Sequence, residues 1–244
     1  RESHLEEVRQ ILKRPYGIIL IAGPTGAGKS TTLYSMLNEL NKEARNIVSL
    51  EDPVEYSIDG VSQSQIRAEI GYTFASGLRT ILRQDPDIIM VGEIRDKETA
   101  QLAIQAALTG HLVFSTLHTN TAIGAIPRLI DMGVDPYLIA RTLILSVAQR
   151  LVKTICPGGQ KAVSDEGALK VMVDKVFKDL PDEYKHKLNL ERPLNEAIPT
   201  SECSTGTRGR IAVFEVFSVD KEIEKIILSE PNEENLWRAA RKKG

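Results

Sequence analysis

A glycine-rich segment, 23–30, combines the residue types that bind phosphate groups. Its three glycines let successive backbone N–H groups point at one anion, and the helix expected to begin near Lys29 adds its N-terminal dipole. Lys29 can reach the β- and γ-phosphates of a nucleotide, and Ser30 can place its hydroxyl on Mg²⁺. The residues expected to contact ATP or ADP are Gly23, Pro24, Thr25, Gly26, Ala27, Gly28, Lys29, Ser30 and Thr31. A glycine-rich turn without a ligand is the alternative, but the segment lies between an apolar run and an amphipathic helical pattern, which favours the nucleotide site.

Acidic residues follow two apolar runs that read as strands. The segment 51–55 comes after the run 47–50, and Glu93 follows the run 88–91, where Gly92 replaces the acid that usually ends a Walker B strand. Acids at the carboxyl ends of parallel strands can hold the water shell of a metal or orient an attacking water. We therefore expect Glu93 to bind Mg²⁺ through water or to polarise the nucleophilic water. A solvated acidic turn remains an equal alternative for 51–55.

Two arginines and a histidine complete the set of candidate residues. Arg79 and Arg83 stand four residues apart on one helical face, which suits an arginine finger that reaches the phosphates of a neighbouring subunit. On these residues alone, a surface helix with two ordinary arginines is the better interpretation. His118 follows the apolar run 112–116 and could hydrogen-bond a γ-phosphate, although a histidine satisfied by backbone groups is the usual alternative.

These residues must be positioned by an alternation of strands and helices. The runs that read as buried strands are 18–22, 47–50, 88–91 and 112–116. The segments with helical periodicity are 29–43, 74–84 and 98–109. Short connections between such elements predict an α/β fold with a mostly parallel sheet that helices cover on both faces. A strand over 210–217 and two short helices, 222–228 and 233–242, are expected near the C-terminal end.

Composition excludes several classes of protein. Hydrophobic residues make up 42% and charged residues 26% of 244 residues, and the net charge is −2, so nothing argues for wrapping nucleic acid or coating an anionic membrane. No apolar stretch reaches the length of a membrane helix, and the charged first residues do not form a signal peptide. Two cysteines 47 residues apart indicate no disulfide framework. A cytosolic protein is expected, and the non-methionine start suggests a part of a longer chain.

Taken together, these segments resemble one family, the ATPases of type II secretion and type IV pilus assembly. The matching stretches are 17–34, 49–56, 74–107 and 109–122. The resemblance implies a RecA-like P-loop NTPase core over 1–152, an inserted subdomain over 153–209, and a truncated strand-and-helix segment over 210–244. It also implies a homo-hexamer on the cytoplasmic face of the inner membrane. Such a hexamer hydrolyses ATP to drive secretion or pilus assembly through a platform protein and an adaptor.

The resemblance assigns roles residue by residue. Glu55 matches the catalytic glutamate, Glu93 the Walker B glutamate, and His118 the histidine near the γ-phosphate. Arg79 and Arg83 match arginines that complete the site of a neighbouring subunit. The resemblance therefore favours this role over a surface helix with two ordinary arginines. The insertion after Arg150 makes assembly-type motors a closer match than retraction motors.

The chain departs from the family pattern in two ways. Assembly-type members carry two Cys-x-x-Cys pairs that bind a structural zinc, whereas here one cysteine of each pair remains, Cys156 and Cys203. Even with His186 as a third ligand we expect no zinc and expect packing to hold this subdomain. The N-terminal domain of the family is absent, so this segment is expected to bind nucleotide and hydrolyse it poorly. A nucleic-acid translocase and a regulatory nucleotide-binding module are the rival functions.

Overall fold

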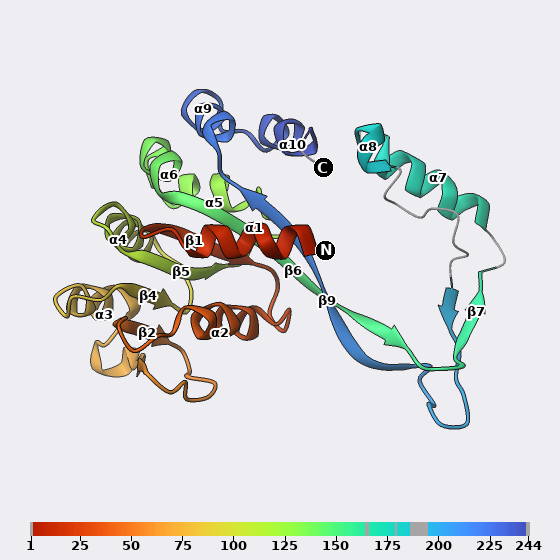
Figure 1. Cartoon of the computed structure of the whole chain (residues 1–244), viewed down its shortest axis with the longest axis horizontal. Coiled ribbons are helices and arrows are strands. Elements are labelled where there is room, and N and C mark those ends of the chain that lie inside the picture. The colour runs from red at the N-terminus through yellow and green to blue at the C-terminus, as the bar shows by residue number, and fades with distance from the viewer. Residues whose placement is uncertain (1, 164–165, 179, 186–194, 243–244) are drawn as a thin grey trace. The chain divides into compact units, whose positions relative to one another are not determined.

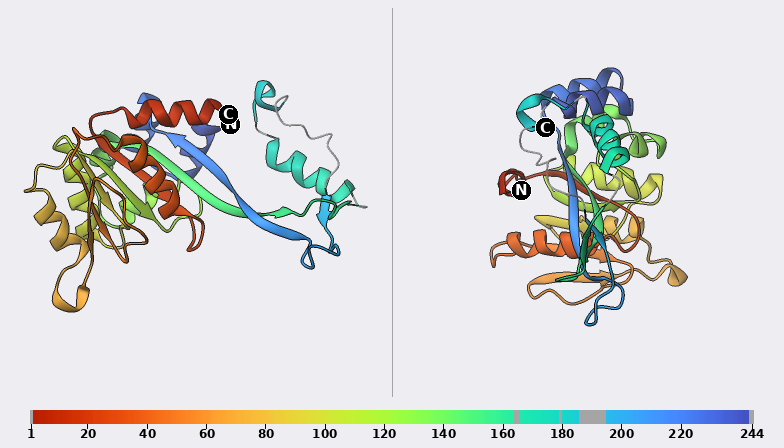
Figure 2. Two further views of the ribbon diagram at one scale, coloured as in Figure 1. Left: turned by 60° about the horizontal axis from the view of Figure 1, so that its bottom comes forward. Right: turned by 90° about the vertical axis from the view of Figure 1, so that its right-hand side faces the viewer.

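The computed structural model describes residues 2–163, 166–178, 180–185 and 195–242. They form two compact units. The first unit comprises residues 1–150 and 214–236, and the second comprises 151–213 and 237–244. The strands β6 and β9 lie side by side and continue from the first unit into the second (Figures 1 and 2). Each unit is described by itself below, and the division into 1–152, 153–209 and 210–244 stays a prediction.

A seven-stranded sheet in the order β3-β2-β4-β5-β1-β6-β9 runs through the first unit. Its strands are β1 (Gly17–Ala22), β2 (Ile47–Glu51), β3 (Val61–Gln65), β4 (Ile88–Val91), β5 (Leu112–Leu117), β6 (Leu143–Ile155) and β9 (Thr207–Ser218). All neighbours from β3 to β6 are parallel. Every residue of β1, β2, β4 and β5 is buried, as expected for parallel strands that are covered on both faces. The predicted α/β fold class is confirmed.

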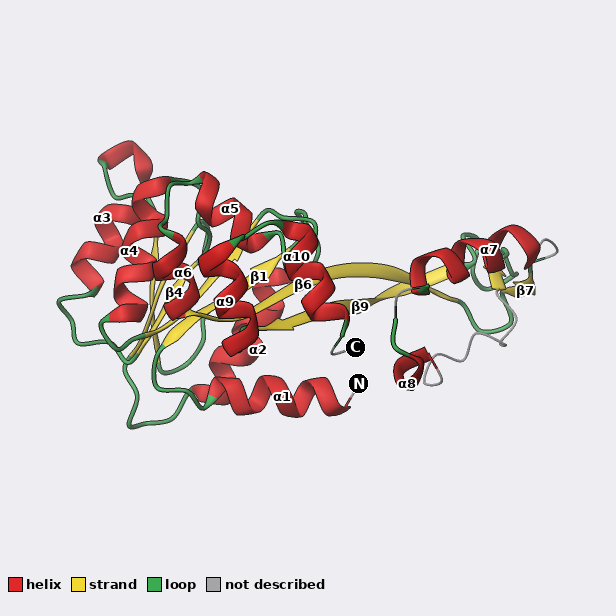
Figure 3. Cartoon of the chain, turned by 90° about the horizontal axis from the view of Figure 1, so that it is seen from above, coloured by secondary structure: helices red, strands yellow, loops and turns green. Residues whose placement is uncertain are grey.

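Helices cover both faces of this sheet (Figure 3). The helices α1 (Glu2–Leu12) and α2 (Lys29–Leu40) lie on one face and share a core with Ile19, Ile21 and Phe114. The helices α3 (Phe74–Ile81), α4 (Lys97–Leu108) and α6 (Pro136–Thr142) lie on the other face. The remaining helices of this part of the chain are η1 (Ala68–Ile70), α5 (Ala125–Asp131), α9 (Lys221–Ser229) and α10 (Glu233–Arg241), the last of which crosses into the second unit.

Local sequence explains where several helices begin and end. Thr73 and Ser76 form a reciprocal capping box at the start of α3, and the side chain of Asp96 accepts from the Thr99 N–H at the start of α4. The helix predicted over 29–43 ends at Leu40, because Asn41 adopts an extended conformation. Of the helices that the structure describes, none combines the length and apolar composition needed to cross a membrane.

In its described residues, the second unit contains a two-stranded sheet, the helices α7 and α8, and the end of α10. The strand β7 (Gln160–Ala162) pairs antiparallel with β8 (Asn195–Ala197). The helices are α7 (Glu166–Phe177) and α8 (Asp182–Lys185). In the same unit the Arg241 guanidinium donates to the Val176 carbonyl at 2.9 Å, which links the end of α10 to α7.

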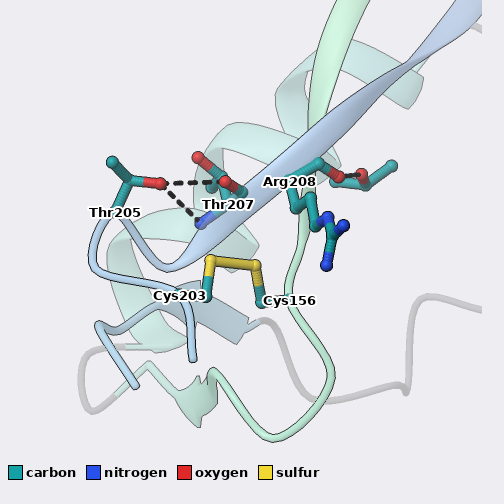
Figure 4. The surroundings of a disulfide bond; sticks show 6 residues. Cys156, Cys203, Thr205, Thr207 and Arg208 are labelled. Atoms are coloured by element: carbon teal, nitrogen blue, oxygen red, sulfur yellow. Dashed lines mark hydrogen bonds between the residues drawn. A yellow bond between two sulfur atoms is a disulfide. The ribbon is translucent and has the colours of Figure 1, made fainter. Parts of the chain in front are cut away.

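A disulfide joins Cys156 to Cys203 in this unit (Figure 4). Each cysteine begins a tight turn, in which Gly159 N donates to the Cys156 carbonyl at 2.9 Å and Gly206 N donates to the Cys203 carbonyl at 3.0 Å. The two turns bring the Cα atoms of the cysteines to 6.6 Å, within the range that a disulfide spans. The expectations that the cysteines form no bridge and that packing alone holds this subdomain were therefore wrong. His186, the suggested third zinc ligand, lies outside the described residues.

Candidate functional site

Residues 23–28 form a loop between the end of β1 and the start of α2, at the carboxyl edge of the sheet, and Lys29 and Ser30 are the first two residues of α2. Gly28 is the N-cap of α2 and has φ of 86° and ψ of 21°. The helix therefore begins at a left-handed backbone conformation, which glycine adopts at little energetic cost. Gly23 has φ of 147°, and a Cβ atom there would lie 2.7 Å from the Gln149 carbonyl oxygen. Both glycines are therefore required by backbone geometry, and the first N–H groups of α2 face the loop.

Lys29 folds back over this loop. Its Nζ donates to the carbonyl oxygens of Gly23 at 2.9 Å and Pro24 at 3.0 Å. Burial lowers the pKa of Lys29 below its usual value, and the positive charge of Arg150 lowers it further, while the negative charge of Glu93 opposes both effects. The ammonium group is thus held close to the loop in a partly desolvated position, where it would attract an anion strongly.

Glu93 lies close enough to Lys29 to affect its pKa, and His118 lies beside Glu93. Glu93 follows β4 and is 9% exposed, and its carboxylate pairs with Arg95. His118, which follows β5, places Nε2 at 3.5 Å from Glu93 Oε2. Glycine suits position 92, before Glu93, because a Cβ atom at this position would lie 3.1 Å from the Leu50 carbonyl oxygen of the neighbouring strand β2. The structure therefore brings together three residues that the sequence singled out, from the carboxyl ends of β1, β4 and β5.

The acidic segment 51–55 at the end of β2 contains one buried glutamate, Glu51, and one exposed glutamate, Glu55. Glu51 is 3% exposed and accepts hydrogen bonds from the hydroxyl of Tyr34, from Ser49 Oγ at 2.5 Å and from Gln63 Nε2 at 3.0 Å. The Tyr34 hydroxyl also accepts from the Glu55 N–H at 3.3 Å, while the residue Glu55 is exposed. Burial and the bond to Glu51 raise the pKa of Tyr34, which keeps the phenol protonated. Glu51 is thus an anchor for the loop that carries Glu55.

Arg79 and Arg83 lie at the end of α3 and just after it. Arg79 is in the last turn of this helix. Arg79 pairs with Glu98 of α4, and both side chains are more than half exposed. Arg83 follows the helix and is also exposed. The roles predicted for these arginines, in the site of a neighbouring subunit, stay a prediction.

Sequence reasoning missed the polar residues at the end of the buried part of β6. The Gln149 side chain contacts the P-loop, and Arg150 donates to the carbonyl of Asn120 at 2.9 Å and to its side-chain Oδ1 at 3.1 Å. In the sequence, the polar residues Gln149 and Arg150 follow the mostly apolar run 143–148, and this change was the signal that could have indicated them. Its meaning depends on the parallel pairing of β6 with β1, which no local pattern reveals.

Comparison with known proteins places this chain among secretion proteins. The family model described as "Type II/IV secretion system protein" matches residues 1–244. Type II secretion system ATPase E of Vibrio cholerae is 48% identical over 237 residues, which cover 97% of this chain and 45% of that protein. Type II secretion system protein E of Pseudomonas aeruginosa is 45% identical and covers 96% of this chain and 45% of its own length. The chain thus spans less than half the length of these relatives.

Solved structures agree with this family and with the fold. The pilus retraction motor PilT with bound ADP has a TM-score of 0.66 and is 30% identical, covering 96% of this chain and 55% of its own. The ATPase DotB of Legionella pneumophila has a TM-score of 0.65 at 27% identity, covering 97% of this chain and 54% of its own. The expected RecA-like core is confirmed by these similarities, and the chain belongs to the type II/IV secretion system protein family.

Proposed function

We propose that this chain is the ATP-hydrolysing part of a motor for type II secretion or type IV pilus assembly. The observation that carries the proposal is the convergence of Lys29, Glu93 and His118 beside a P-loop, at the carboxyl ends of neighbouring parallel strands. Ligands of open parallel sheets bind at that edge. The ADP bound to the related motor PilT supports a nucleotide as the ligand.

In this proposal the loop and Lys29 stabilise the charge that spreads over the β- and γ-phosphates during hydrolysis. Lys29 already bonds two loop carbonyls, so little reorganisation is needed when the phosphates arrive. His118 Nε2 lies 3.5 Å from the Glu93 carboxylate, which acts on Lys29, so His118 would respond to a γ-phosphate bound there. Glu55, on the exposed loop that Tyr34 tethers, would orient or deprotonate the attacking water.

Magnesium fits the residues present, because Ser30 and Glu93 offer the oxygen donors that this ion prefers. Ser30 stands in the first turn of α2, and the Glu93 carboxylate lies close enough to Lys29 to oppose the lowering of its pKa. Ser30 would bind the ion directly, and Glu93 would bind it through water. The ion would supply charge neutralisation at the β- and γ-phosphates.

The finer parts of the proposal concern the assembly. We infer a homo-hexamer, in which Arg79 and Arg83 act on the nucleotide of the neighbouring subunit, because both residues are exposed on the surface of their own chain. The motor would work at the cytoplasmic face of the inner membrane and move a platform protein and an adaptor. Residues 153–209 would form the inserted subdomain of assembly-type motors, without zinc.

The experiment is a steady-state ATPase assay with Mg-ATP, combined with isothermal titration of ADP, on the protein as the cell makes it. We expect Lys29→Ala to abolish tight ADP binding, whereas Glu55→Ala should bind ADP normally and turn over ATP slowly. Unchanged ADP affinity in Lys29→Ala would remove the phosphate site from this loop. Normal turnover in Glu55→Ala would remove that residue from the mechanism.

Mixed assemblies test whether Arg79 acts on the nucleotide of a neighbouring subunit. A ring of Arg79→Ala subunits should bind ADP and hydrolyse ATP slowly. Adding Lys29→Ala subunits, which keep Arg79, should restore part of the activity, because each supplies an intact arginine to a neighbour that still binds nucleotide. If mixing restores no activity, Arg79 does not act between subunits.

A further inference from the structure

Gln149 is a buried glutamine. Among the residues that the structure describes, its side chain hydrogen-bonds only to the P-loop and to α2. The register of β6 with β1 pairs Ala148 with Ala22, so Gln149 lies beside the first residue of the loop, Gly23. Its side-chain Nε2 donates to the Ala27 carbonyl at 2.7 Å, and its Oε1 accepts from Thr32 Oγ1 at 2.7 Å. The residue is 3% exposed. Because a carbonyl can only accept, Ala27 determines which end of the amide faces the loop.

This hydrogen bond fixes the orientation of one peptide group in the loop. In a trans peptide the C=O and the following N–H point in opposite directions. The Ala27 carbonyl points at Gln149 on β6, so the Gly28 N–H points away from the sheet strand, toward the open side of the loop. Gly28 is the N-cap of α2, and N–H groups at this position are the donors that hold an anion at a helix N-terminus.

The second hydrogen bond of the glutamine acts on the helix. Thr32 belongs to the first turn of α2, and its N–H donates to the Gly28 carbonyl at 3.2 Å. The bond from its hydroxyl to Gln149 therefore ties the first helical turn to β6. One side chain thus connects both the last loop peptide and the first turn of α2 to a neighbouring strand of the sheet.

We propose that Gln149 is a positioning residue of the phosphate site, which holds the Ala27–Gly28 peptide with its N–H toward the ligand and holds α2 in register with β6. The proposal rests on the proposed function, since it requires nucleotide phosphates to bind at this loop. Gln149 itself does not touch the ligand in this view. The steric need for glycine at position 23 is separate, because it arises from the main-chain carbonyl of Gln149 and is independent of its side chain.

The matched control lies on the same strand. Ser146 is fully buried, and its Oγ donates to the Ala122 carbonyl at 2.7 Å, so it makes the same kind of bond away from the P-loop. The test compares Gln149→Leu, Gln149→Glu and Ser146→Ala in the nucleotide-free thermal midpoint and in the Kd for ADP, measured well below each midpoint. Leucine leaves the Ala27 carbonyl without its donor, and glutamate places a carboxylate against it.

We expect both Gln149 variants to raise the Kd for ADP by roughly tenfold or more, whereas Ser146→Ala stays within about twofold of the unmodified protein although its midpoint falls. The proposal is overturned if the Gln149 variants bind ADP normally while their midpoints fall as in Ser146→Ala, because the glutamine then serves stability alone. Failure of the unmodified protein to bind ADP would instead refute the proposed function.

A second measurement needs no variant and stays decisive if the Gln149 variants do not fold. In the unmodified protein with ¹⁵N-labelled glutamine, the side-chain NH₂ signals of Gln149 should exchange slowly with solvent and shift when ADP is added. Exchange at the rate of an exposed amide, or signals that ADP leaves unchanged, would contradict the proposal.

Discussion

Replacing Tyr34 by phenylalanine tests how the loop that carries Glu55 is held. The Tyr34 side chain is fully buried, its hydroxyl donates to the nearly buried Glu51 carboxylate, and it accepts from the Glu55 N–H. Phenylalanine keeps the ring and removes only the oxygen, so packing is preserved and two hydrogen bonds are lost. A hydrogen bond to a charged group contributes about 1.5–3 kcal/mol, and Ser49 and Gln63 remain as donors to Glu51, so we expect a loss of about 2 kcal/mol.

The assay is thermal unfolding of Tyr34→Phe beside Tyr16→Phe, which makes the same chemical change at a residue that is 53% exposed. At about 2–4 °C per kcal/mol for a unit of this size, the midpoint of Tyr34→Phe should fall by roughly 4–8 °C, and that of Tyr16→Phe should hardly move. The turnover of ATP should also fall, because Glu55 loses its backbone tether, while ADP affinity stays normal. A midpoint within about 1 °C of the unmodified protein would refute the anchoring role of Glu51 and Tyr34.

Two further changes follow from the same structure. The pKa of Lys29 is lower in the folded chain than in the unfolded chain, so folding disfavours its charged form at neutral pH. Lys29→Met should therefore unfold at the same or a higher temperature without nucleotide and gain nothing from ADP; a clear fall in the nucleotide-free midpoint would contradict this reasoning. Reducing the Cys156–Cys203 disulfide opens a loop of 47 residues, for which chain entropy predicts a loss of about 4 kcal/mol in the second unit. Limited proteolysis with and without dithiothreitol should show faster cleavage between the cysteines after reduction, and Cys156→Ser should behave as the reduced protein does; equal rates would mean that the disulfide does not hold this unit.

The strands that were predicted correctly are those with a strong local pattern. The run 88–91 was predicted with its exact bounds, and the strands that begin at 17, 47 and 112 each differ by one residue at one end. Buried parallel strands read as short, uninterrupted apolar runs bounded by polar or glycine residues, so their positions are visible locally. The helices α1, α5 and α6 and the strands β3 and β6 were among the elements missed: β3 carries almost no apolar residues, and α5 and α6 are too short to show a clear period.

The candidate site divides in the same way. Local sequence identified the P-loop, Glu93 and His118, because each follows a recognisable strand and carries a side chain suited to phosphate chemistry. It could not separate Glu51 from Glu55, because both lie in one acidic segment. Only packing shows that Glu51 is buried among three hydrogen-bond donors while Glu55 is exposed.

The sequence by itself determined the phosphate-binding chemistry of this protein and the positions of its four central buried strands, because glycine conformation, apolar runs and residue type are local properties. The tertiary structure alone decided which distant residues share a neighbourhood. It placed Gln149 against the P-loop, Arg79 beside Glu98 of α4, and Cys156 within bonding distance of Cys203. Each of these depends on strand order or turn geometry across tens of residues, which pairing and packing set and which no short segment encodes.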